Sequence, residues 1–244
     1  MPIRFSLRPI PIEAADKISS MLQYPEGVEQ TLLDLAASHF SADETDQVRA
    51  TIAFAKSLES VDPHHPTLRV YFSHPLRVAT LALRLTSPPD LEIVKTALLH
   101  NVFEVSGLEE NDLVGAGYSE RLARGIRLLT IDRHRQYDPE YLAEFYHQIE
   151  SFGADLALIK CVDKLDNLLA FELFERTPQI EVYLEMCDRF VAPMAQRLSA
   201  ELGDYVSESI SYARTSGCRP DLKAKYDLFV SQANAAAQAQ EAAS

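Results

Sequence analysis

The sequence predicts an all-α protein, and three of its features favour that fold class. Only 8 of its 244 residues are Gly. Its 13 Pro lie mainly between apolar runs, where helices end and begin. Apolar residues recur at spacings of three and four almost throughout, as one face of a helix requires. We therefore expect helices joined by short loops.

The expected helices follow one another along the chain. They cover residues 12–22, 27–38, 43–60, 75–86, 90–105, 109–115, 118–128, 138–151, 154–175, 179–201, 203–212 and 220–240. Pro75 stands in the first turn of the helix after His74, where its missing N–H costs nothing. The Ser-Pro-Pro-Asp segment at 87–90 ends that helix and caps the next, so we expect these two helices to form a hairpin.

Two segments interrupt the helical pattern. Residues 129–139 mix charges without apolar periodicity, which predicts a surface loop that borders a site. The last residues, from 232 onward, are rich in Ala and Gln and lack large apolar side chains, so they should form a frayed helix end or be disordered.

The net charge of the chain limits the kinds of molecule that it is expected to bind. The chain has 23 Lys and Arg against 36 Asp and Glu, a formal charge of −13. A field of this sign repels phosphate, which disfavours non-specific binding to nucleic acid or to an anionic membrane. An anionic substrate would therefore need a local basic patch or a metal ion.

Cysteine usage indicates a reducing compartment. Cys161, Cys187 and Cys218 are an odd number, widely spaced, without the spacing of a disulfide framework or a zinc knuckle. The N-terminus has no apolar stretch of signal-peptide length, and no run of about 18 apolar residues occurs. We expect a cytoplasmic protein.

A histidine and a glutamate share one face of the helix expected over 90–105. Ile93, Ala97, His100 and Glu104 are spaced i, i+4, i+7 and i+11. Taken alone, an inward imidazole is usually a core residue bonded to a backbone carbonyl, and that alternative stays open.

A carboxylate falls within the apolar stripe of the helix expected over 154–175. Asp163 follows Ile159 by four residues, Asn167 comes one turn later on the same side, and Asp166 lies near the edge of that face. A buried carboxylate is costly unless it is paired or bound to a cation. It is therefore either a buried salt bridge to a Lys or Arg of another helix, or a metal ligand.

His74 stands at the start of its helix. There the positive end of the helix dipole favours the neutral imidazole, which is the form that binds metals. Each of the three features alone favours a structural role. Together, two histidines and an inward carboxylate on three different helices are suited to one divalent site.

Positive side chains gather in two places and could serve an anionic substrate. Arg77 lies on the helix after His74, and Lys160 and Lys164 flank Asp163. The second group surrounds the expected loop and comprises Arg121, Arg124, Arg127, Arg133 and Arg135. Such groups favour phosphate contacts, and the alternative is a solvated face of ordinary salt bridges. Two roles are open for Tyr137, Tyr141 and Tyr146. Their rings could stack on a nucleotide base, or they could pack in the core.

Three ordered blocks carry a family resemblance. They read HPLRVA at 74–79, ALLHNVFE at 97–104 and LIKCVDKLDNL at 158–168. These blocks resemble the HD-domain superfamily, and more narrowly the hydrolase domain of RelA/SpoT-type alarmone enzymes and the small alarmone hydrolases. That family reads approximately H-P-x-x-V-A, A-L-L-H-D-x-x-E-D and I-K-x-A-D-x-L-x-N. The resemblance covers roughly residues 45–200, and Tyr71 matches the family's Tyr-x-x-His-Pro.

The resemblance implies an HD-domain-like helical bundle and a divalent metal, usually manganese. The implied metal ligands are His74, His100, Asn101 and Asp163. Glu104, with Asn101, would form the catalytic group that positions or activates water, and the implied activity is removal of the 3′-pyrophosphate from guanosine tetra- or pentaphosphate. Substrate contacts are expected from Asn167, Arg77, Lys164 and Tyr71.

This chain departs from the family at two acids. Asn101 replaces the Asp of the His-Asp pair, and Val105 replaces the second acid of Glu-Asp. An amide keeps an oxygen donor but removes a charge, so metal affinity should fall. We therefore carry two hypotheses: a metal-dependent phosphohydrolase acting on a nucleotide phosphate or pyrophosphate ester, and a degenerate member that binds a nucleotide or a protein without turnover.

The resemblance also divides the chain into three parts. We expect an N-terminal helical extension over 1–40, the HD-like hydrolase domain over 41–202 and a C-terminal helical extension with a loose tail over 203–244. The expected partner is a small-molecule nucleotide or phosphate ester, with no bulk nucleic acid and no membrane. A homo-oligomer is left open.

Overall fold

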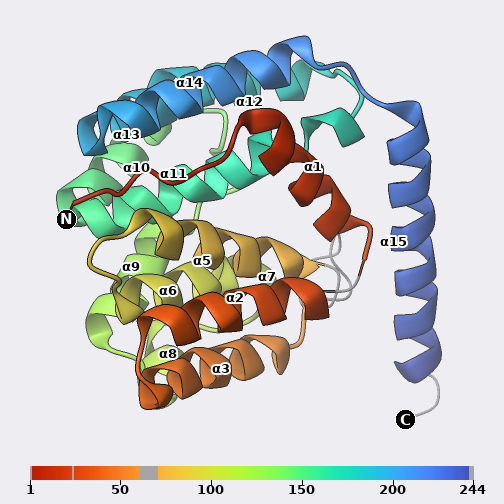
Figure 1. Ribbon diagram of the computed structural model, residues 1–244. Helices are drawn as coiled ribbons and strands as arrows, with labels where there is room; N and C mark the ends of the chain where they lie inside the picture. The colour runs from red at the N-terminus through yellow and green to blue at the C-terminus, as the bar shows by residue number, and fades with distance from the viewer. Residues whose placement is uncertain (1, 24, 61–70, 242–244) are drawn as a thin grey trace.

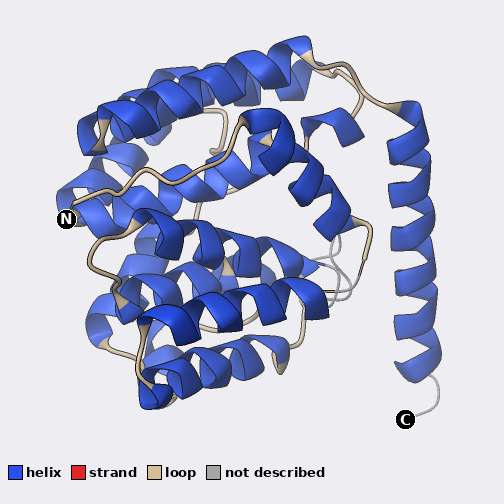
Figure 2. Ribbon diagram, viewed as in Figure 1, coloured by secondary structure: helices blue, strands red, loops and turns tan. Residues whose placement is uncertain are grey.

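The structure is a computed structural model that describes residues 2–23, 25–60 and 71–241 (Figure 1). Within these ranges every regular element is a helix (Figure 2), and the one isolated β-bridge joins Ile3 to Thr86. The predicted all-α class is confirmed. The elements in chain order are α1 (Ile10–Met21), α2 (Glu26–His39), α3 (Ala42–Lys56), α5 (Ser73–Leu85), α6 (Leu91–Leu99), α7 (Val102–Val105), α8 (Glu110–Gly115), α9 (Glu120–Leu129), α10 (Pro139–Phe152), α11 (Ala154–Leu168), η1 (Phe171–Leu173), α12 (Pro178–Met186), η2 (Cys187–Val191), α13 (Ala192–Leu198), α14 (Ala200–Thr215) and α15 (Pro220–Glu241).

Helix α5 occupies the centre of the bundle. It packs against α6, α2 and α11, and α11 in turn packs against α13 and α14 on the far side (Figure 1). The α5 residues Leu76, Val78, Ala79 and Ala82 are fully buried, as their apolar periodicity requires. The bundle thus holds α5, α6 and α11, the helices with the three blocks, against one another.

Two local predictions are confirmed. Helices α5 and α6 form the expected hairpin, and the carboxylate of Asp90 caps α6 by accepting from the backbone N–H groups of Glu92 and Ile93. The segment between α9 and α10 is non-helical, as predicted for residues 129–139.

The prediction of one unbroken helix over 90–105 was wrong. Helix α6 ends at Leu99, and a single turn, α7, begins at Val102. Asn101 leaves the helical conformation with φ −109° and ψ 8°, and its side-chain amide donates to the hydroxyl of Tyr71 instead of capping α7. Short polar side chains that bond outside their own helix disfavour helical continuity.

Three other expected helices end early or are interrupted. Helix α3 stops at Lys56, and α11 stops at Leu168 and is followed by the 3₁₀ turn η1. The helix expected over 179–201 contains a π-helical stretch at Cys187–Val191 and ends before Ser199, whose side chain caps α14. Pro193 lies just after the π-helical stretch and has no N–H for the α-helical ladder, which is consistent with the local change of pairing.

Helix α15 runs along one side of the bundle, with the C-terminus at its far end (Figure 1). It packs against η1 near its beginning and stays helical to Glu241, so the described part of the expected loose tail is helical. Residues 242–244 of that tail lie outside the described residues. No helix in the described ranges combines the length and apolarity needed to cross a bilayer.

Candidate metal centre

Asp163 lies at the centre of the site. It projects from the inward face of α11, among Leu156, Ile159 and Val162, and its side chain is almost completely buried. One carboxylate oxygen, Oδ1, lies 3.3 Å from Nε2 of His74 and 3.8 Å from Nε2 of His100. Three helices therefore converge on this oxygen, α11, α5 and the end of α6.

His100 presents an unpaired nitrogen to this centre. Its Nδ1 lies 2.7 Å from the carbonyl oxygen of Ala97, so Nδ1 carries the proton and donates. Nε2 is buried, and none of the described residues forms a hydrogen bond with it. Burial lowers the pKa of His100 to about 3, so the imidazole is neutral and Nε2 holds a free lone pair.

His74 is held in the matching orientation by a second carboxylate. Its Nδ1 lies 2.8 Å from Oδ2 of Asp166, so that nitrogen donates and Nε2 is directed at Asp163. Burial lowers the pKa of His74, but hydrogen bonds to Asp163 and Asp166 outweigh burial and raise it. The two carboxylates therefore shift the pKa of His74 in the direction opposite to the one expected from its place at a helix N-terminus.

Asp166 lies at the centre of a buried network of charged side chains. It is fully buried and accepts from the Lys17 ammonium and from Nε of Arg77, which lies 2.8 Å from Oδ1. Burial alone would raise the pKa of Asp166, but these cations and His74 hold it far below its usual range. Lys17 belongs to α1, so the N-terminal helix takes part in fixing His74.

The three converging residues fit a metal ion. One ligand atom from each of His74, His100 and Asp163 lies within 4.8 Å of the other two. The Nδ1 of His74 is hydrogen-bonded to a carboxylate and that of His100 to a backbone carbonyl. Such bonds at the second ring nitrogen are typical of metal-bound histidines. The unpaired Nε2 of His100 supplies the lone pair that a cation needs. Two nitrogens and one oxygen suit a divalent transition metal.

Asn101 and Glu104 lie at the edge of this centre. The amide nitrogen of Asn101 donates to the hydroxyl of Tyr71. Glu104 accepts from Arg133, with 2.8 Å between Oε2 and Nη2, and from the backbone N–H of Ile131 at 3.4 Å. The break after His100 thus directs Glu104 toward the loop between α9 and α10.

Two lysines occupy the other side of Asp163. Nζ of Lys160 lies 3.2 Å from Oδ2 and Nζ of Lys164 lies 3.3 Å from it, while Asn167 donates to Oδ1 from 3.2 Å. Burial raises the pKa of Asp163, but both lysines outweigh it and hold the pKa well below its usual range. The salt-bridge alternative for Asp163 is therefore present, with lysines of its own helix and not of another, and the metal-ligand alternative stays a prediction.

A cavity of about 830 Å³ opens over this centre. Its wall includes most of the predicted site residues: Tyr71, His74, Asn101, Glu104, Asp163, Lys164 and Asn167. Arg77 lies outside it, with its guanidinium on Asp166 and its side chain in the wall of a second cavity of about 290 Å³. The volume of the first cavity, about 830 Å³, is in the range of small-molecule sites.

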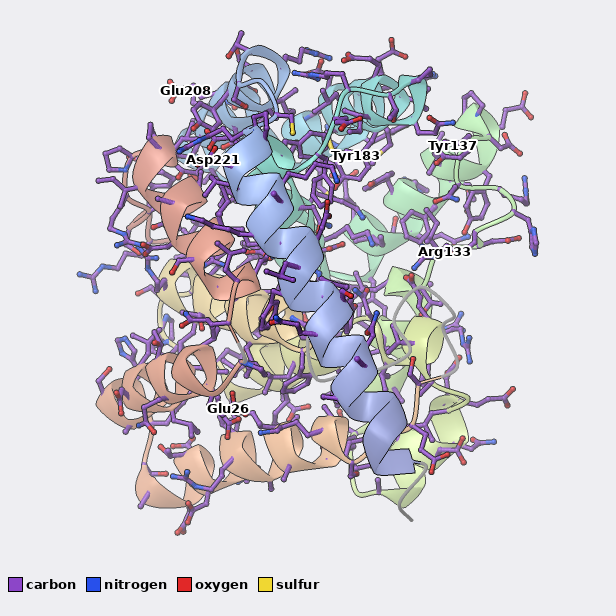
Figure 3. The ribbon with its side chains drawn as sticks, turned by 90° about the vertical axis from the view of Figure 1, so that its right-hand side faces the viewer. Glu26, Arg133, Tyr137, Tyr183, Glu208 and Asp221 are labelled. Carbon is purple, nitrogen blue, oxygen red and sulfur yellow. The ribbon has the colours of Figure 1, made fainter. Side chains whose placement is uncertain are left out.

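The arginines near the loop are mostly engaged in surface pairs. Arg121 pairs with Asp155, Arg135 with Asp138, and both Arg124 and Arg127 with Glu110. Arg133 is the member that lines the cavity, together with Tyr137 and Tyr146. In Figure 3, Arg133 and Tyr137 lie on the same side of α15.

Sequence reasoning missed two contributors to this site, Lys17 and the α15 wall of the cavity. Lys17 could have been found, because Glu13 and Lys17 interrupt the apolar stripe formed by Ile10, Ala14 and Ile18. The cavity residues Lys223, Tyr226, Val230 and Asn234 of α15 carry no such signal, since their spacing of three and four is that of one face of any mixed helix.

Comparisons with known proteins find likenesses among solved structures. No family model matches the chain, and no curated protein does. Among solved structures, the chain is similar to a metazoan ortholog of SpoT that hydrolyzes ppGpp, with a TM-score of 0.45 and 19% sequence identity. The match covers 79% of this chain and 96% of that one.

Proposed function

We propose that the chain is a metal-dependent phosphohydrolase of the HD type, with His74, His100 and Asp163 as metal ligands. The observation that carries the proposal is the buried, unpaired Nε2 of His100, which lies close to Asp163 and His74, two residues of the cavity wall. An unsatisfied buried nitrogen is costly unless a ligand occupies it. The metal is divalent, and manganese is the choice that the sequence resemblance favours.

The residues around the metal centre would have different roles in hydrolysis. A bound divalent cation would supply Lewis-acid polarisation of a phosphoryl oxygen and a lowered water pKa. Glu104 keeps free lone pairs beside its bond to Arg133, so it can orient a water molecule and accept its proton as the new P–O bond forms and the ester bond breaks. Lys164 and Arg133, both in the cavity wall, would bind the phosphate oxygens.

The proposed substrate is a nucleotide phosphate or pyrophosphate ester, with the 3′-pyrophosphate of ppGpp as the first member to assay. The sequence blocks that resemble alarmone hydrolases support this choice. Asn167 and Tyr71, both in the cavity wall, remain the proposed substrate contacts. Arg77 is proposed instead as a partner of Asp166, because that carboxylate already accepts from its Nε.

The second candidate function is nucleotide binding without turnover. It is favoured by the charge around Asp163, where Asn101 adds no negative charge and Lys160 and Lys164 add two positive ones. If this holds, nucleotide binding persists in chelator and phosphate release stays at background. In the enzyme, Asn101→Asp would tighten metal binding by roughly tenfold, because it adds a carboxylate ligand.

Phosphate or pyrophosphate release from ppGpp and common nucleotides, with and without Mn²⁺, tests the proposal. Asp163→Ala should abolish both release and metal binding. Glu104→Gln should lower the rate by roughly 10²–10⁴-fold and leave metal affinity nearly unchanged. Turnover that persists in Asp163→Ala, or that is equal with and without metal, would sink the proposal.

A further inference from the structure

The cavity extends well beyond the metal centre. A divalent ion with a water molecule fills only a small part of about 830 Å³. The remaining space runs beneath α15, which crosses this face of the molecule (Figure 3). Lys223, Tyr226, Val230 and Asn234 of α15 all line it.

The two parts of the cavity differ in chemistry. Near the metal centre the wall carries the cations Lys17, Lys160, Lys164 and Arg133. Beneath α15 it carries the aromatic and apolar side chains of Phe171, Phe174, Ile180, Tyr183, Tyr226 and Val230, interspersed with the polar Glu175, Thr177, Gln179 and Asn234. A ligand that satisfies both parts has an anionic group at one end and, at the other, a flat group with aromatic faces and polar edges.

Three aromatic rings make the apolar part suitable for a planar group. The rings of Phe174 and Tyr226 meet edge to face with centroids 6.2 Å apart, which joins η1 and its following loop to α15. Phe174 is 39% exposed despite its size. The ring of Tyr183 lies 5.7 Å from Nζ of Lys164 and so connects the aromatic part to the cationic part.

Tyr183 provides a second, independent sign of a ligand. Its hydroxyl is buried beside Asn167 and Cys187 and, in the part of the chain that the structure describes, makes no hydrogen bond of ordinary geometry. A buried hydroxyl without a partner is costly. A polar atom of a bound molecule would satisfy it, and the hydroxyl lies in the wall of the same cavity.

We propose that α15 forms the base-binding wall of this cavity, with Tyr226, Phe174 and Tyr183 holding the planar base of a nucleotide whose phosphates lie at the metal centre. This deepens the proposed function and rests on it for the position of the phosphates. The helix then determines specificity for the base, while the metal ligands act on the phosphate. Lys223, whose Nζ lies 2.6 Å from Asp227, also lines the cavity.

The absence of tryptophan from the sequence allows a direct test. Tyr226→Trp places the only indole of the chain in the cavity, and Leu228→Trp places it on the outer face of the same helix, where Leu228 is 59% exposed. Each variant is titrated with GDP and with ribose 5-phosphate, which lacks a base, in Mn²⁺ and in chelator. GDP should change the emission of Tyr226→Trp saturably, and ribose 5-phosphate should not. Leu228→Trp should respond to neither.

Affinity provides the second readout. In equilibrium dialysis, Tyr226→Ala should bind GDP about tenfold more weakly than the parent chain, as expected for the loss of one stacking ring, whereas Leu228→Ala should bind equally well. The base-binding wall is refuted if the parent binds no GDP at millimolar concentration, or if it binds GDP while Tyr226→Trp stays silent and Tyr226→Ala binds normally.

The two proposals fail in different ways. If GDP binds through Tyr226 but no variant or parent releases phosphate, the base-binding wall stands and the phosphohydrolase does not. If metal-dependent release from ribose 5-phosphate and from nucleotides is equally fast and is unaffected by Tyr226→Ala, the phosphohydrolase stands and the base-binding wall does not.

Discussion

Nδ1 of His74 lies 2.8 Å from Oδ2 of Asp166, a carboxylate three residues beyond Asp163 on the same helix. One helix therefore supplies both the proposed metal ligand and the group that orients another ligand. A carboxylate behind a histidine raises its basicity and fixes its ring. It also adds negative charge close to a centre in which Asn101 is neutral.

Asp166→Asn should weaken Mn²⁺ binding by roughly 10–100-fold, because it removes this charge and the acceptor for Nδ1 of His74. Paramagnetic resonance of free Mn²⁺ measures the affinity. Asp155→Asn, at the first turn of the same helix and paired with surface Arg121, is the matched control and should bind normally. Equal affinities in the two variants would show that Asp166 does not contribute to Mn²⁺ binding.

Lys17→Met should destabilise the chain by about 3–5 kcal/mol, because it leaves the buried Asp166 short of one cation. Chemical denaturation of the metal-free protein measures the free energy of unfolding. Lys56→Met removes a lysine from an exposed pair with Glu29 and should cost less than about 1 kcal/mol. Similar losses of unfolding free energy in both variants would mean that the buried ion pair of Lys17 stabilises the fold no more than an exposed pair does.

Lys164→Met should have opposite effects on metal and substrate. Its Nζ lies 3.3 Å from Asp163, so its removal takes a positive charge from the neighbourhood of the cation and should tighten Mn²⁺ binding by roughly tenfold. It should also weaken nucleotide binding, since a proposed phosphate contact is lost. Titration with each ligand separates the two effects, and weaker binding of both would contradict the proposed charge balance.

Mn²⁺ affinity should rise with pH over the range in which His74 loses its proton. Burial lowers the pKa of His74, but its two carboxylate partners outweigh burial and raise it above 6.5, whereas burial lowers that of His100 to about 3. Ligand nitrogens must be deprotonated, so His74 releases a proton on binding and His100 does not. The Kd should fall by about tenfold per pH unit below the pKa of His74 and level off above it.

Calorimetry in buffers of different ionisation enthalpy should count about one released proton in that range. Binding that is independent of pH between about 6 and 8 would contradict the geometry at His74. In the metal-free protein the raised pKa stabilises the fold fully below 6.5, and this contribution is lost as the pH rises through the raised value.

The convergence of His74, His100 and Asp163 could be predicted because each polar side chain interrupts an apolar face of a strongly periodic helix. Burial of a polar group is itself the signal, and the fold brings the three buried groups together. The hairpin of α5 and α6 followed in the same way from Pro75 and Asp90.

Other features depend on tertiary contacts that periodicity does not encode. Lys17 and Asp166 are 149 residues apart, so their pairing is invisible along the chain. Asn101, where the helix breaks, donates to the hydroxyl of Tyr71, and Asp166 contributes to the raised pKa of His74. The position of α15 over the cavity is decided by its packing on η1.

Stoichiometric Mn²⁺ titration of the metal-free protein, beside Asp163→Ala, tests the central claim most directly. We expect one ion per chain in the parent and none in Asp163→Ala, because Asp163 supplies the oxygen on which both histidines converge. Absence of binding in the parent at millimolar Mn²⁺, or an unchanged single ion in Asp163→Ala, would contradict the metal centre.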